Sequence, residues 1–482
     1  MRNYLAFDLG AESGRAMLGT ITADFLVLEE LHRFANTPVR VFNALYWDTL
    51  RLWHEIQEGI RIAARDRKLD LAGIGVDTWG VDFALIGADG HLVDNPRHYR
   101  DERNNGMLEK VFEVVPRAEV FDHTGLQFMQ LNTLYQLYAM KLANSPALQT
   151  AKKLLMIPDL FSYWLSGVAK CELTDASTTQ FYDPRKKRWS TELFDKLGLP
   201  KHILGEIVQP GTRLGNCILP DMGSVPVYAT GSHDTASAVA AVPAEGGSWA
   251  YISSGTWSLM GVELDEPVVN EQALAANFTN EIGAEGKVRF LKNIAGLWLL
   301  QECRRAWILE GKEYGYPELA RMAAEARPFS AIIDPDAFLL PGDMPGQIAA
   351  YCRKTGQKPP ADAGQYARTI FEGLSLRYRH VLEILEGLIG RRIEVIHLVG
   401  GGSKNAVLNQ FVADSLNRTV IAGPGEATAI GNVVIQAIGA GELADLAAAR
   451  ALIRKSFPLE TFRPAPKAGW DAAYEKYRAL PR

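Results

Sequence analysis

Cysteine is scarce in this chain, and its few cysteines are not spaced for metal binding. The 482 residues contain no CxxC pair and no His/Cys spacing that suits zinc. The cysteines are scattered, at Cys171, Cys217, Cys303 and Cys352. Because the sequence also shows no secretory leader, we expect reduced thiols rather than a disulfide framework.

Long apolar runs and a strong net charge are also absent. Residues 1–8 enter a strand-like segment without an apolar leader or a cleavage site, and no later segment is long enough to span a bilayer. A net charge of −5, with 47% hydrophobic and 22% charged residues, gives no reason to expect nucleic acid or anionic lipid as a partner. We expect a cytoplasmic globular protein without nucleic-acid or membrane partners, and the oligomeric state stays open.

Several well-known catalytic signatures are missing. The sequence has no Walker A motif, no GxSxG elbow, no HExxH helix and no Rossmann GxGxxG in the right context. P-loop NTPases, α/β-hydrolases, zincins and ordinary dehydrogenases are therefore excluded. Two polar hairpins, a loop with a carboxylate and a glycine-rich turn remain to carry the chemistry.

The carboxylate loop, residues 229–238, lies between a predicted strand at residues 225–228 and a predicted helix of small apolar residues at 236–242. Ligands of open α/β sheets bind beyond the carboxyl ends of the strands, so we expect Asp234 to face a crevice. A carboxylate in that position suits a general base. The alternative is a residue of an ordinary turn.

The first polar hairpin places a carboxylate, Asp8, in an apolar strand at residues 5–9, before a polar turn at 10–15 and a second strand at 16–21. A buried aspartate is unfavourable unless it is paired or holds a metal, although it could also simply cap the turn. Residues 249–261 repeat the strand–turn–strand pattern without the acid, which indicates an internal duplication. We predict two domains, 1–243 and 244–482, joined at a turn-rich linker.

Two further turns carry candidate ligand groups. A predicted strand at residues 71–76 leads into residues 77–83, where two acids, a threonine and a tryptophan surround Gly80, a set that suits a polyol. An ordinary hairpin turn with solvated acids is the alternative. After a predicted buried parallel strand at 395–399, three glycines precede a helix at 406–416, an arrangement that lets backbone approach a phosphate.

The remaining pattern predicts helices and one loop. Residues 174–180 are expected to form a polar loop, and Asn293 is expected to cap a helix that runs to residue 309. Other predicted helices cover residues 50–67, 131–144, 151–165 with an interruption at Pro158, 190–197, and 366–387. Phosphoryl transfer is the reaction that the two polar hairpins, the glycine-rich turn and the carboxylate loop together favour, because in such a reaction the protein mainly positions groups and stabilises charge.

These motifs resemble those of the FGGY carbohydrate kinases in their usual order along nearly the whole chain: residues 8–10 with 13–15, 231–234, 253–256 and 400–405. Within that family, residues 77–83, 232–239, 251–261 and 291–301 are most similar to members that phosphorylate L-rhamnulose. The resemblance implies an α/β fold of two duplicated ribonuclease-H-like domains, of the actin and hexokinase ATPase type, flanking a catalytic cleft. It also implies that a ketose and ATP are the small-molecule partners and that Mg²⁺ is required.

The resemblance assigns roles residue by residue. Asp234 matches the catalytic base, and Asp8 matches a residue that holds Mg²⁺ through water. The ketose contacts implied are Gly80, Asp82, His233, Thr235 and Asn293. The nucleotide contacts implied are Ala11, Glu12, Ser13, Gly14, Arg15, Thr256, Gln301, Gly400, Gly401 and Gly402.

One position departs from the pattern, and some alternatives stay open. Glu12 stands where the similar kinases often have a small hydroxyl residue, and its carboxylate would repel phosphates unless it faces away or pairs with Arg15. L-Fuculose, D-xylulose or glycerol would use the same base, since function depends on the site more than on the fold. A non-enzymatic actin-like protein that binds sugar or nucleotide is the alternative of another class.

Overall fold

The computed structural model describes residues 1–220, 222–340, 342–465 and 469–481. The chain divides into two compact units. The first unit contains Met1–Pro243, Glu263–Phe290 and Ala427–Ser456, and the second contains Ala244–Val262, Leu291–Glu426 and Phe457–Arg482. Residue 243 ends the first segment, as the domain prediction has it, but the first unit also takes two later segments. The division into domains 1–243 and 244–482 stays a prediction.

A six-stranded sheet, ordered β13-β14-β6-β1-β2-β3, forms the centre of the first unit. Its strands are β1 (Arg2–Leu9), β2 (Ser13–Ile21), β3 (Leu26–Ala35), β6 (Leu71–Thr78), β13 (Arg213–Asn216) and β14 (Pro226–Tyr228). Strand β1 pairs antiparallel with β2 and parallel with β6, and β6 pairs parallel with β14. Residues 4–9 of β1 are all buried, as is typical of a strand with both faces covered.

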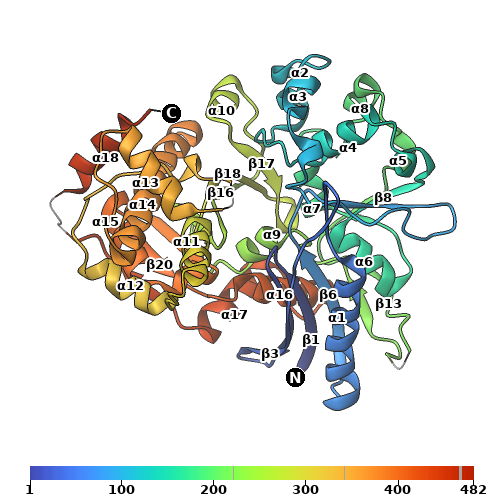
Figure 1. The fold of residues 1–482 in the computed structure, drawn as a ribbon. Helices are drawn as coiled ribbons and strands as arrows, with labels where there is room; N and C mark the ends of the chain where they lie inside the picture. Colours follow the sequence, from blue (N-terminus) through green and yellow to red (C-terminus); the bar gives the residue numbers. More distant parts are fainter. Residues whose placement is uncertain (221, 341, 466–468, 482) are drawn as a thin grey trace. The chain divides into compact units, whose positions relative to one another are not determined.

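Helices cover both faces of this sheet (Figure 1). On one face, α1 (Thr49–Arg61) and α6 (Ile157–Ser166) share an apolar core with β1 and β6. On the other, α16 (Ala427–Gly439) packs on β1 and β6 and crosses α9 (Asp234–Ala240). At that crossing a Cβ on Gly431 would lie 1.8 Å from the carbonyl oxygen of Ser237, so only glycine allows the contact. Helix α9 is thereby anchored where it follows the carboxylate loop.

The rest of the first unit forms a second apolar cluster and smaller pairs of strands. The pairs are β4 (Val39–Val41) with β5 (Ala44–Tyr46), β7 (Phe83–Ile86) with β8 (Lys153–Met156), β9 (Cys171–Glu172) with β12 (Ile207–Val208), and β10 (Tyr182–Asp183) with β11 (Arg188–Trp189). Strand β17 (Thr279–Ile282) also belongs to this unit and pairs with β18 (Val288–Ala295). The helices are α2 (Met107–Phe112), α3 (Arg117–Thr124), α4 (Thr133–Leu142), α5 (Pro146–Thr150), α7 (Leu173–Ala176), α8 (Thr191–Leu197), α10 (Glu271–Ala276) and α17 (Leu446–Ser456).

The second unit repeats the strand pairing of the first. Strand β15 (Trp249–Ser254) pairs antiparallel with β16 (Trp257–Leu264) and parallel with β19 (Val395–Val399), which pairs parallel with β20 (Thr419–Ala422). Strand β21 (Glu460–Phe462) joins β20, and β18 (Val288–Ala295) enters from the first unit. The helices are α11 (Trp298–Leu309), α12 (Tyr316–Glu325), α13 (Met344–Lys354), α14 (Ala363–Ile389), α15 (Ala406–Leu416) and α18 (Trp470–Arg478). The expected duplicated α/β fold is confirmed.

Three predictions of local structure are wrong. Residues 151–165 are not one helix, because β8 pairs with β7 before α6 begins with Pro158 in its first turn, where proline is tolerated. Residues 174–180 are helical turns rather than a loop. Asn293 lies in β18 and caps no helix, since α11 begins after Leu297.

Two expectations about composition can be compared with the structure. All four cysteines are buried and unpaired. Among the helices that the structure describes, none combines the length and the apolar character needed to cross a membrane.

Candidate active site

The carboxylate loop lies at the carboxyl ends of β6 and β14. The Thr78 N–H donates to the Ser232 carbonyl at 2.9 Å, and an isolated parallel bridge joins Thr78 to His233. Asp234 is the first residue of α9, and its side chain keeps 30% of its surface exposed. The Thr235 hydroxyl donates to Asp234 Oδ1 at 3.0 Å. The predicted base and Thr235 therefore lie together at the end of the sheet, as the strand–loop–helix pattern indicates.

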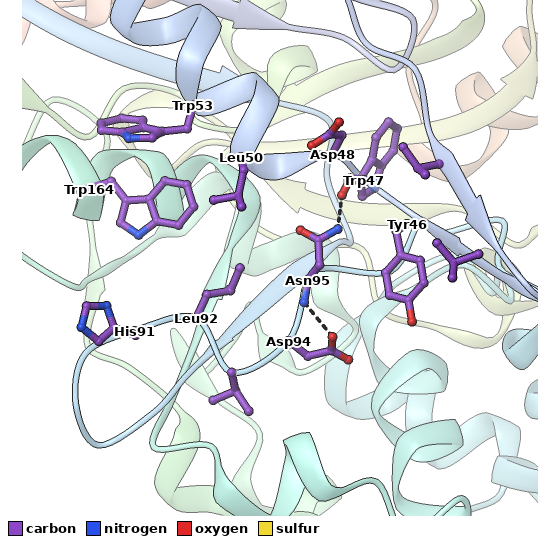
Figure 2. Close-up of a pocket in the computed structure, with 13 residues that line it drawn as sticks. Tyr46, Trp47, Asp48, Leu50, Trp53, His91, Leu92, Asp94, Asn95 and Trp164 are labelled. Carbon is purple, nitrogen blue, oxygen red and sulfur yellow. Dashed lines mark hydrogen bonds between the residues drawn. The ribbon is translucent and has the colours of Figure 1, made fainter.

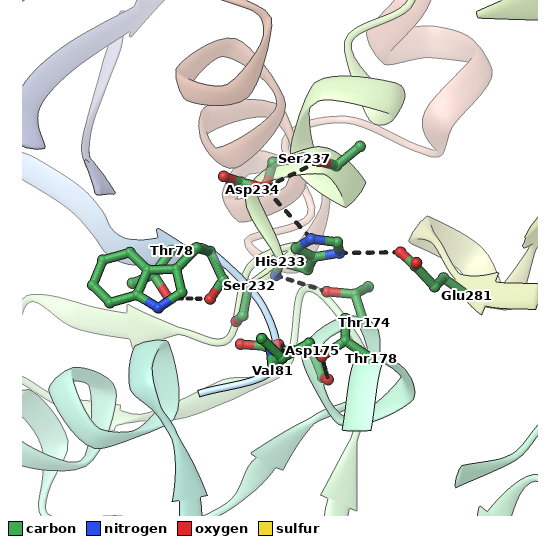
Figure 3. Close-up of polar contacts among 12 residues, drawn as sticks. Thr78, Val81, Thr174, Asp175, Thr178, Ser232, His233, Asp234, Ser237 and Glu281 are labelled. Atoms are coloured by element: carbon green, nitrogen blue, oxygen red, sulfur yellow. Dashed lines mark hydrogen bonds and ion pairs between the residues drawn. The ribbon is translucent and has the colours of Figure 1, made fainter. Parts of the chain in front are cut away.

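A buried glutamate, Glu172, supports this loop through hydrogen bonds. Glu172 Oε2 accepts hydrogen bonds from the Ser232 N–H at 3.2 Å, the Thr174 N–H at 2.9 Å and the Thr174 hydroxyl at 2.6 Å. Thr174 Oγ1 in turn accepts from the His233 N–H at 3.1 Å (Figure 3). Burial raises the pKa of Glu172 to about 7, although these donors act in the opposite direction. The backbone N–H groups of Ser232 and His233 are thus held by Glu172 and by Thr174, which belongs to the segment wrongly predicted as a loop.

The imidazole of His233 lies between two carboxylates (Figure 3). Its Nε2 is 3.5 Å from Asp234 Oδ1 and its Nδ1 is 3.4 Å from Glu281 Oε2. Arg289, which is fully buried, brings a guanidinium nitrogen within 3.0 Å of both His233 Nδ1 and Glu281 Oε2. Burial acts to raise the pKa of Glu281, but the charge of the Arg289 guanidinium acts in the opposite direction, and this pKa stays below its usual value.

Asp8 and Asp77 lie side by side on the paired strands β1 and β6. Asp8 is 5% exposed and forms an ion pair with Arg15, its partner across the β1–β2 hairpin. Asp77 accepts from the Asn432 amide at 2.6 Å through Oδ2, while its buried Oδ1 has no partner among the described residues. Burial, with Asp8 and Asp234 nearby, raises the pKa of Asp77 well above its usual value. A cation near these carboxylates would relieve that repulsion.

The turn predicted to bind a polyol is built around Asp82. Its Oδ2 accepts from the indole N–H groups of Trp47 at 2.6 Å and Trp79 at 3.1 Å and from the Tyr99 N–H, and its Oδ1 accepts from Gln136 at 2.8 Å. Burial raises its pKa to about 6 despite these donors. With both oxygens engaged and no exposed surface, Asp82 positions the turn instead of offering a free acceptor to a ligand.

Gly80, in the same turn, packs against the 174–180 segment. A Cβ on Gly80 would lie 2.9 Å from Thr178 Cγ2, and the Thr178 hydroxyl accepts from the Val81 N–H at 3.0 Å. Val81 itself has a positive φ of 68°, a conformation that a β-branched residue rarely adopts. The turn is therefore held in one shape by its contacts.

A cavity of about 1030 Å³ in the first unit is separate from the predicted site (Figure 2). It is lined by β4, β5, the start of α1, residues 91–95 and Trp164, and none of the predicted site residues lines it. Trp47 connects it to the polyol turn, because Trp47 lines the cavity and its ring also lies against that of Trp79, tilted by 33° at a centroid distance of 3.9 Å.

The predicted nucleotide residues of the hairpin, Ala11, Glu12, Ser13, Gly14 and Arg15, form the β1–β2 turn and the start of β2. Glu12 is exposed, and its carbonyl accepts from the Asn36 N–H at 3.0 Å. The Arg15 guanidinium is directed toward the Asp8 carboxylate, with which it forms an ion pair. A phosphate in this turn could therefore contact the backbone N–H groups without repulsion from the Glu12 carboxylate only if the Glu12 side chain faces away from it.

The second unit gathers the other predicted nucleotide residues around the ends of β15 and β19. Gly400 has a φ of +82°, and a Cβ on Gly402 would lie 2.1 Å from Ser254 Oγ, so this turn lies against β15. A Cβ on Gly401 would meet nothing within 4 Å, which leaves open space at the middle glycine. The Thr256 carbonyl accepts from the Trp298 N–H at 3.1 Å, which ties the second hairpin to the start of α11.

Gln301, on α11, has a buried Oε1 without a hydrogen-bond partner in the part of the chain that the structure describes. Such an orphaned acceptor suits a ligand that carries an amino or hydroxyl donor. Gly296, which the sequence prediction missed, allows the close contact of α11 with the hairpin, because its Cβ would lie 2.7 Å from the Thr256 carbonyl. Asn293, the predicted ketose contact, lies in the second-unit part of β18.

Sequence reasoning also missed four residues of the site. It did not group Asp77 with Asp8, and it did not single out Glu172, Glu281 or Arg289. Asp77 could have been found from its register with Asp8, since both acids end neighbouring strands. Within the described ranges, no three His, Cys, Asp or Glu side chains gather into a direct metal site. The Mg²⁺ contact predicted for Asp8 through water stays a prediction.

Two sheet-centred α/β units, a part-exposed aspartate at the start of α9 and glycine-rich turns after strands are the architecture of sugar kinases of the actin and hexokinase class. The N-terminal domain of the FGGY family of carbohydrate kinases matches residues 3–241 and its C-terminal domain matches residues 250–440. The chain belongs to this family.

Relatives and solved structures agree with that assignment. The chain is 46% identical over 484 residues to the rhamnulokinase of Bacteroides thetaiotaomicron, covering 99% of each chain, and 43% identical over 490 residues to that of Pectobacterium carotovorum, covering 100% of this chain and 97% of the relative. The xylulose kinase of Lactobacillus acidophilus has a similar fold, with a TM-score of 0.80 at 16% identity over 100% of this chain and 98% of that one.

Proposed function

We propose that this protein transfers the γ-phosphoryl group of ATP to the 1-hydroxyl of L-rhamnulose, giving L-rhamnulose 1-phosphate and ADP. Full-length identity of 46% and 43% to proteins named rhamnulokinase supports the sugar. The single structural observation that supports the chemistry is the contrast among the acids of the first unit. Asp234 keeps 30% of its side chain exposed, whereas Asp8 is ion-paired and Asp77 is fully buried.

Asp234 is the proposed general base. An ionised carboxylate can accept the proton of the attacking hydroxyl only if it is accessible and not consumed by an ion pair with an arginine, and Asp234 meets both conditions better than Asp8 or Asp77. A well-placed base of this kind contributes roughly 10²- to 10⁴-fold to the rate. The neighbouring hydroxyl of Thr235 holds Asp234 Oδ1 and limits its rotation.

The proposed ketose contacts are His233, Thr235 and Gly80, with Asn293 as a further prediction. In this scheme Asp82 acts indirectly, because its hydrogen bonds to Trp47 and Trp79 fix the turn that contains Gly80. A turn fixed before the sugar arrives binds it without the entropic penalty of ordering a loop.

The proposed nucleotide contacts are the 11–15 turn in the first unit, and Thr256, Gln301 and residues 400–402 in the second. The open space at Gly401 and the orphaned Oε1 of Gln301 support a ligand there. Asp8, beside the unpartnered Oδ1 of Asp77, would hold a hydrated Mg²⁺, since oxygen donors suit that cation. When bound, Mg²⁺ would neutralise charge on the phosphates.

A coupled assay of ADP release with L-rhamnulose, L-fuculose, D-xylulose and glycerol tests this proposal. We expect kcat/KM to be highest for L-rhamnulose by at least about tenfold, with phosphate on the terminal hydroxyl by ³¹P NMR. A higher kcat/KM for another acceptor would mean that this acceptor, and not L-rhamnulose, is the substrate, while the protein would still be a sugar kinase. Tight ketose binding without ADP release from any acceptor would favour the non-enzymatic alternative.

A further inference from the structure

We infer that Arg289 and Glu281 are positioning residues that hold His233 as the neutral imidazole protonated on Nε2, so that His233 donates a hydrogen bond toward the bound ketose. The inference rests on the proposed function for the role of His233 but derives the proton's position from this chain's own contacts. All three residues belong to the first unit, and Arg289 lies 56 residues from His233 in the sequence.

The position of the proton follows from the donor at Nδ1. A guanidinium carries only N–H donors and stays charged in proteins, so the Arg289 nitrogen at 3.0 Å from His233 Nδ1 must donate to it. Nδ1 therefore presents its lone pair, and the ring proton is on Nε2. The competing carboxylate of Glu281 lies farther from Nδ1, at 3.4 Å, and already accepts from the same guanidinium nitrogen at 3.0 Å.

The contacts of Arg289 fix this donor in place. Arg289 is 0% exposed and its Nε donates to the Ile282 carbonyl at 3.2 Å, so its charge is buried and its orientation is fixed from two sides. Glu281 neutralises that buried charge. Because Nδ1 accepts from Arg289, the ring carries only the proton on Nε2.

The consequence is a donor on the side of the ring that faces the base. Nε2 lies 3.5 Å from Asp234 Oδ1, too far for a good hydrogen bond but close enough to share a ligand with it. In this arrangement the Nε2 proton is offered to a ketose oxygen while Asp234 accepts the proton of the attacking hydroxyl. If the ring carried its proton on Nδ1, Nε2 would be an acceptor and would compete with Asp234 for that hydroxyl.

Removing each charge separately distinguishes this role from ordinary packing. With Arg289→Met, the Glu281 carboxylate is left 3.4 Å from Nδ1 without the competing donor, so the proton should move to Nδ1 and donate to Glu281. With Glu281→Gln, Arg289 still donates to Nδ1 and the Nε2 proton should stay. The double variant Glu281→Met/Arg289→Met removes both charges of the pair, so neither is left buried without its partner. It can therefore be measured if Arg289→Met alone fails to fold.

The measurement is long-range ¹H–¹⁵N NMR of protein labelled at histidine, above the range in which histidine is charged, with His233→Gln to assign the signals. We expect the Nε2–H form in the wild type and in Glu281→Gln, and the Nδ1–H form in Arg289→Met. Steady-state kinetics should show KM for the ketose raised about tenfold in Arg289→Met, with little change in KM for ATP, and raised less in the double variant, in which neither neighbour fixes the proton.

Arg368→Met is the matched control, since it removes a buried arginine that pairs with Glu372 at 2.7 Å in the second unit. It should lower thermal stability without altering the His233 signals or KM for the ketose. An Nδ1–H form in the wild type, or an unchanged proton position in a folded Arg289→Met, would overturn the inference. Failure of the proposed function would instead show as a wild type that turns over none of the acceptors, whatever its NMR spectrum.

Discussion

Replacing Glu172 with glutamine tests how the loop that carries Asp234 is supported. Glu172 is 1% exposed, and its Oε2 accepts from the backbone N–H groups of Ser232, Thr174 and Asp175 and from the Thr174 hydroxyl. Glutamine has the same shape and can present a carbonyl oxygen to all four donors, but it cannot ionise. The substitution therefore removes a buried charge while it keeps the support of the loop.

The size of the effect follows from the pKa. Burial raises the pKa of Glu172 from 4.5 to about 7 in the folded protein, so the folded state holds this proton more tightly than the unfolded state. Stability from this group is complete below about pH 4.5 and is lost as the pH rises through about 7. The full difference is about 3 kcal/mol in unfolding free energy, of which about 2 kcal/mol falls between about pH 5 and about pH 8.

Equilibrium unfolding in urea, followed by tryptophan fluorescence, measures this quantity at several pH values. The free energy of unfolding of Glu172→Gln minus that of the wild type should increase by about 2 kcal/mol from about pH 5 to about pH 8. The exposed Glu318→Gln should follow the wild type at every pH. A difference between Glu172→Gln and the wild type that stays constant with pH would refute a raised pKa at this position. A large loss of kcat in a stable Glu172→Gln would show that the negative charge itself is needed.

Four other substitutions test the site. Asp234→Asn should bind ketose normally but lose roughly 10²- to 10⁴-fold in kcat, so turnover within a few-fold of wild type would exclude Asp234 as the base. Gly401→Val should fold normally, because its Cβ would meet no atom of the described residues within 4 Å, and should raise KM for ATP far more than KM for the ketose; its control Gly402→Val, which collides with Ser254, should lose stability by thermal unfolding. Asp82→Asn should raise KM for the ketose with little effect on KM for ATP, because its amide would meet the Gln136 donor and disturb the turn; equal changes in both KM values would place Asp82 elsewhere in the mechanism.

Much of the fold could be predicted because its signals are local. The Asp8 hairpin and its counterpart at residues 249–261 are contiguous strand–turn–strand patterns, and both appear where expected, with β1 and β15 as the central strands. The loop that contains Asp234 could be predicted equally well, because a polar segment between a strand and a helix of small apolar residues has few other interpretations. Patterns within about twenty residues thus predicted the architecture and the position of Asp234, whose role as the base stays a prediction.

The errors arise where tertiary contacts or side-chain hydrogen bonds decide the structure. Residues 153–156, of which the last three are apolar, look helical, but their pairing with β7 makes them a strand. Residues 174–180 look like a loop because serine and threonine favour turns, yet here the hydroxyls of Ser177, Thr178 and Thr179 each donate to the carbonyl three residues earlier and so stabilise helical turns. A sequence pattern cannot show which of these competing hydrogen bonds is formed.

The residues that fix His233 mark the limit of sequence reasoning most clearly. Arg289 and Glu281 belong to the β17–β18 hairpin, and nothing in the residues around either one indicates a partner in the 229–238 loop. Their pairing would be unremarkable as an ordinary buried salt bridge, which is at best weakly stabilising compared with apolar packing. What favours keeping such a pair is the ring nitrogen that lies within 3.0 Å of the guanidinium, since an apolar residue in place of Arg289 would let Glu281 draw the proton of His233 to Nδ1. The ion pair is therefore better explained by the hydrogen-bonding direction that it imposes on the site than by the stability that it adds to the fold.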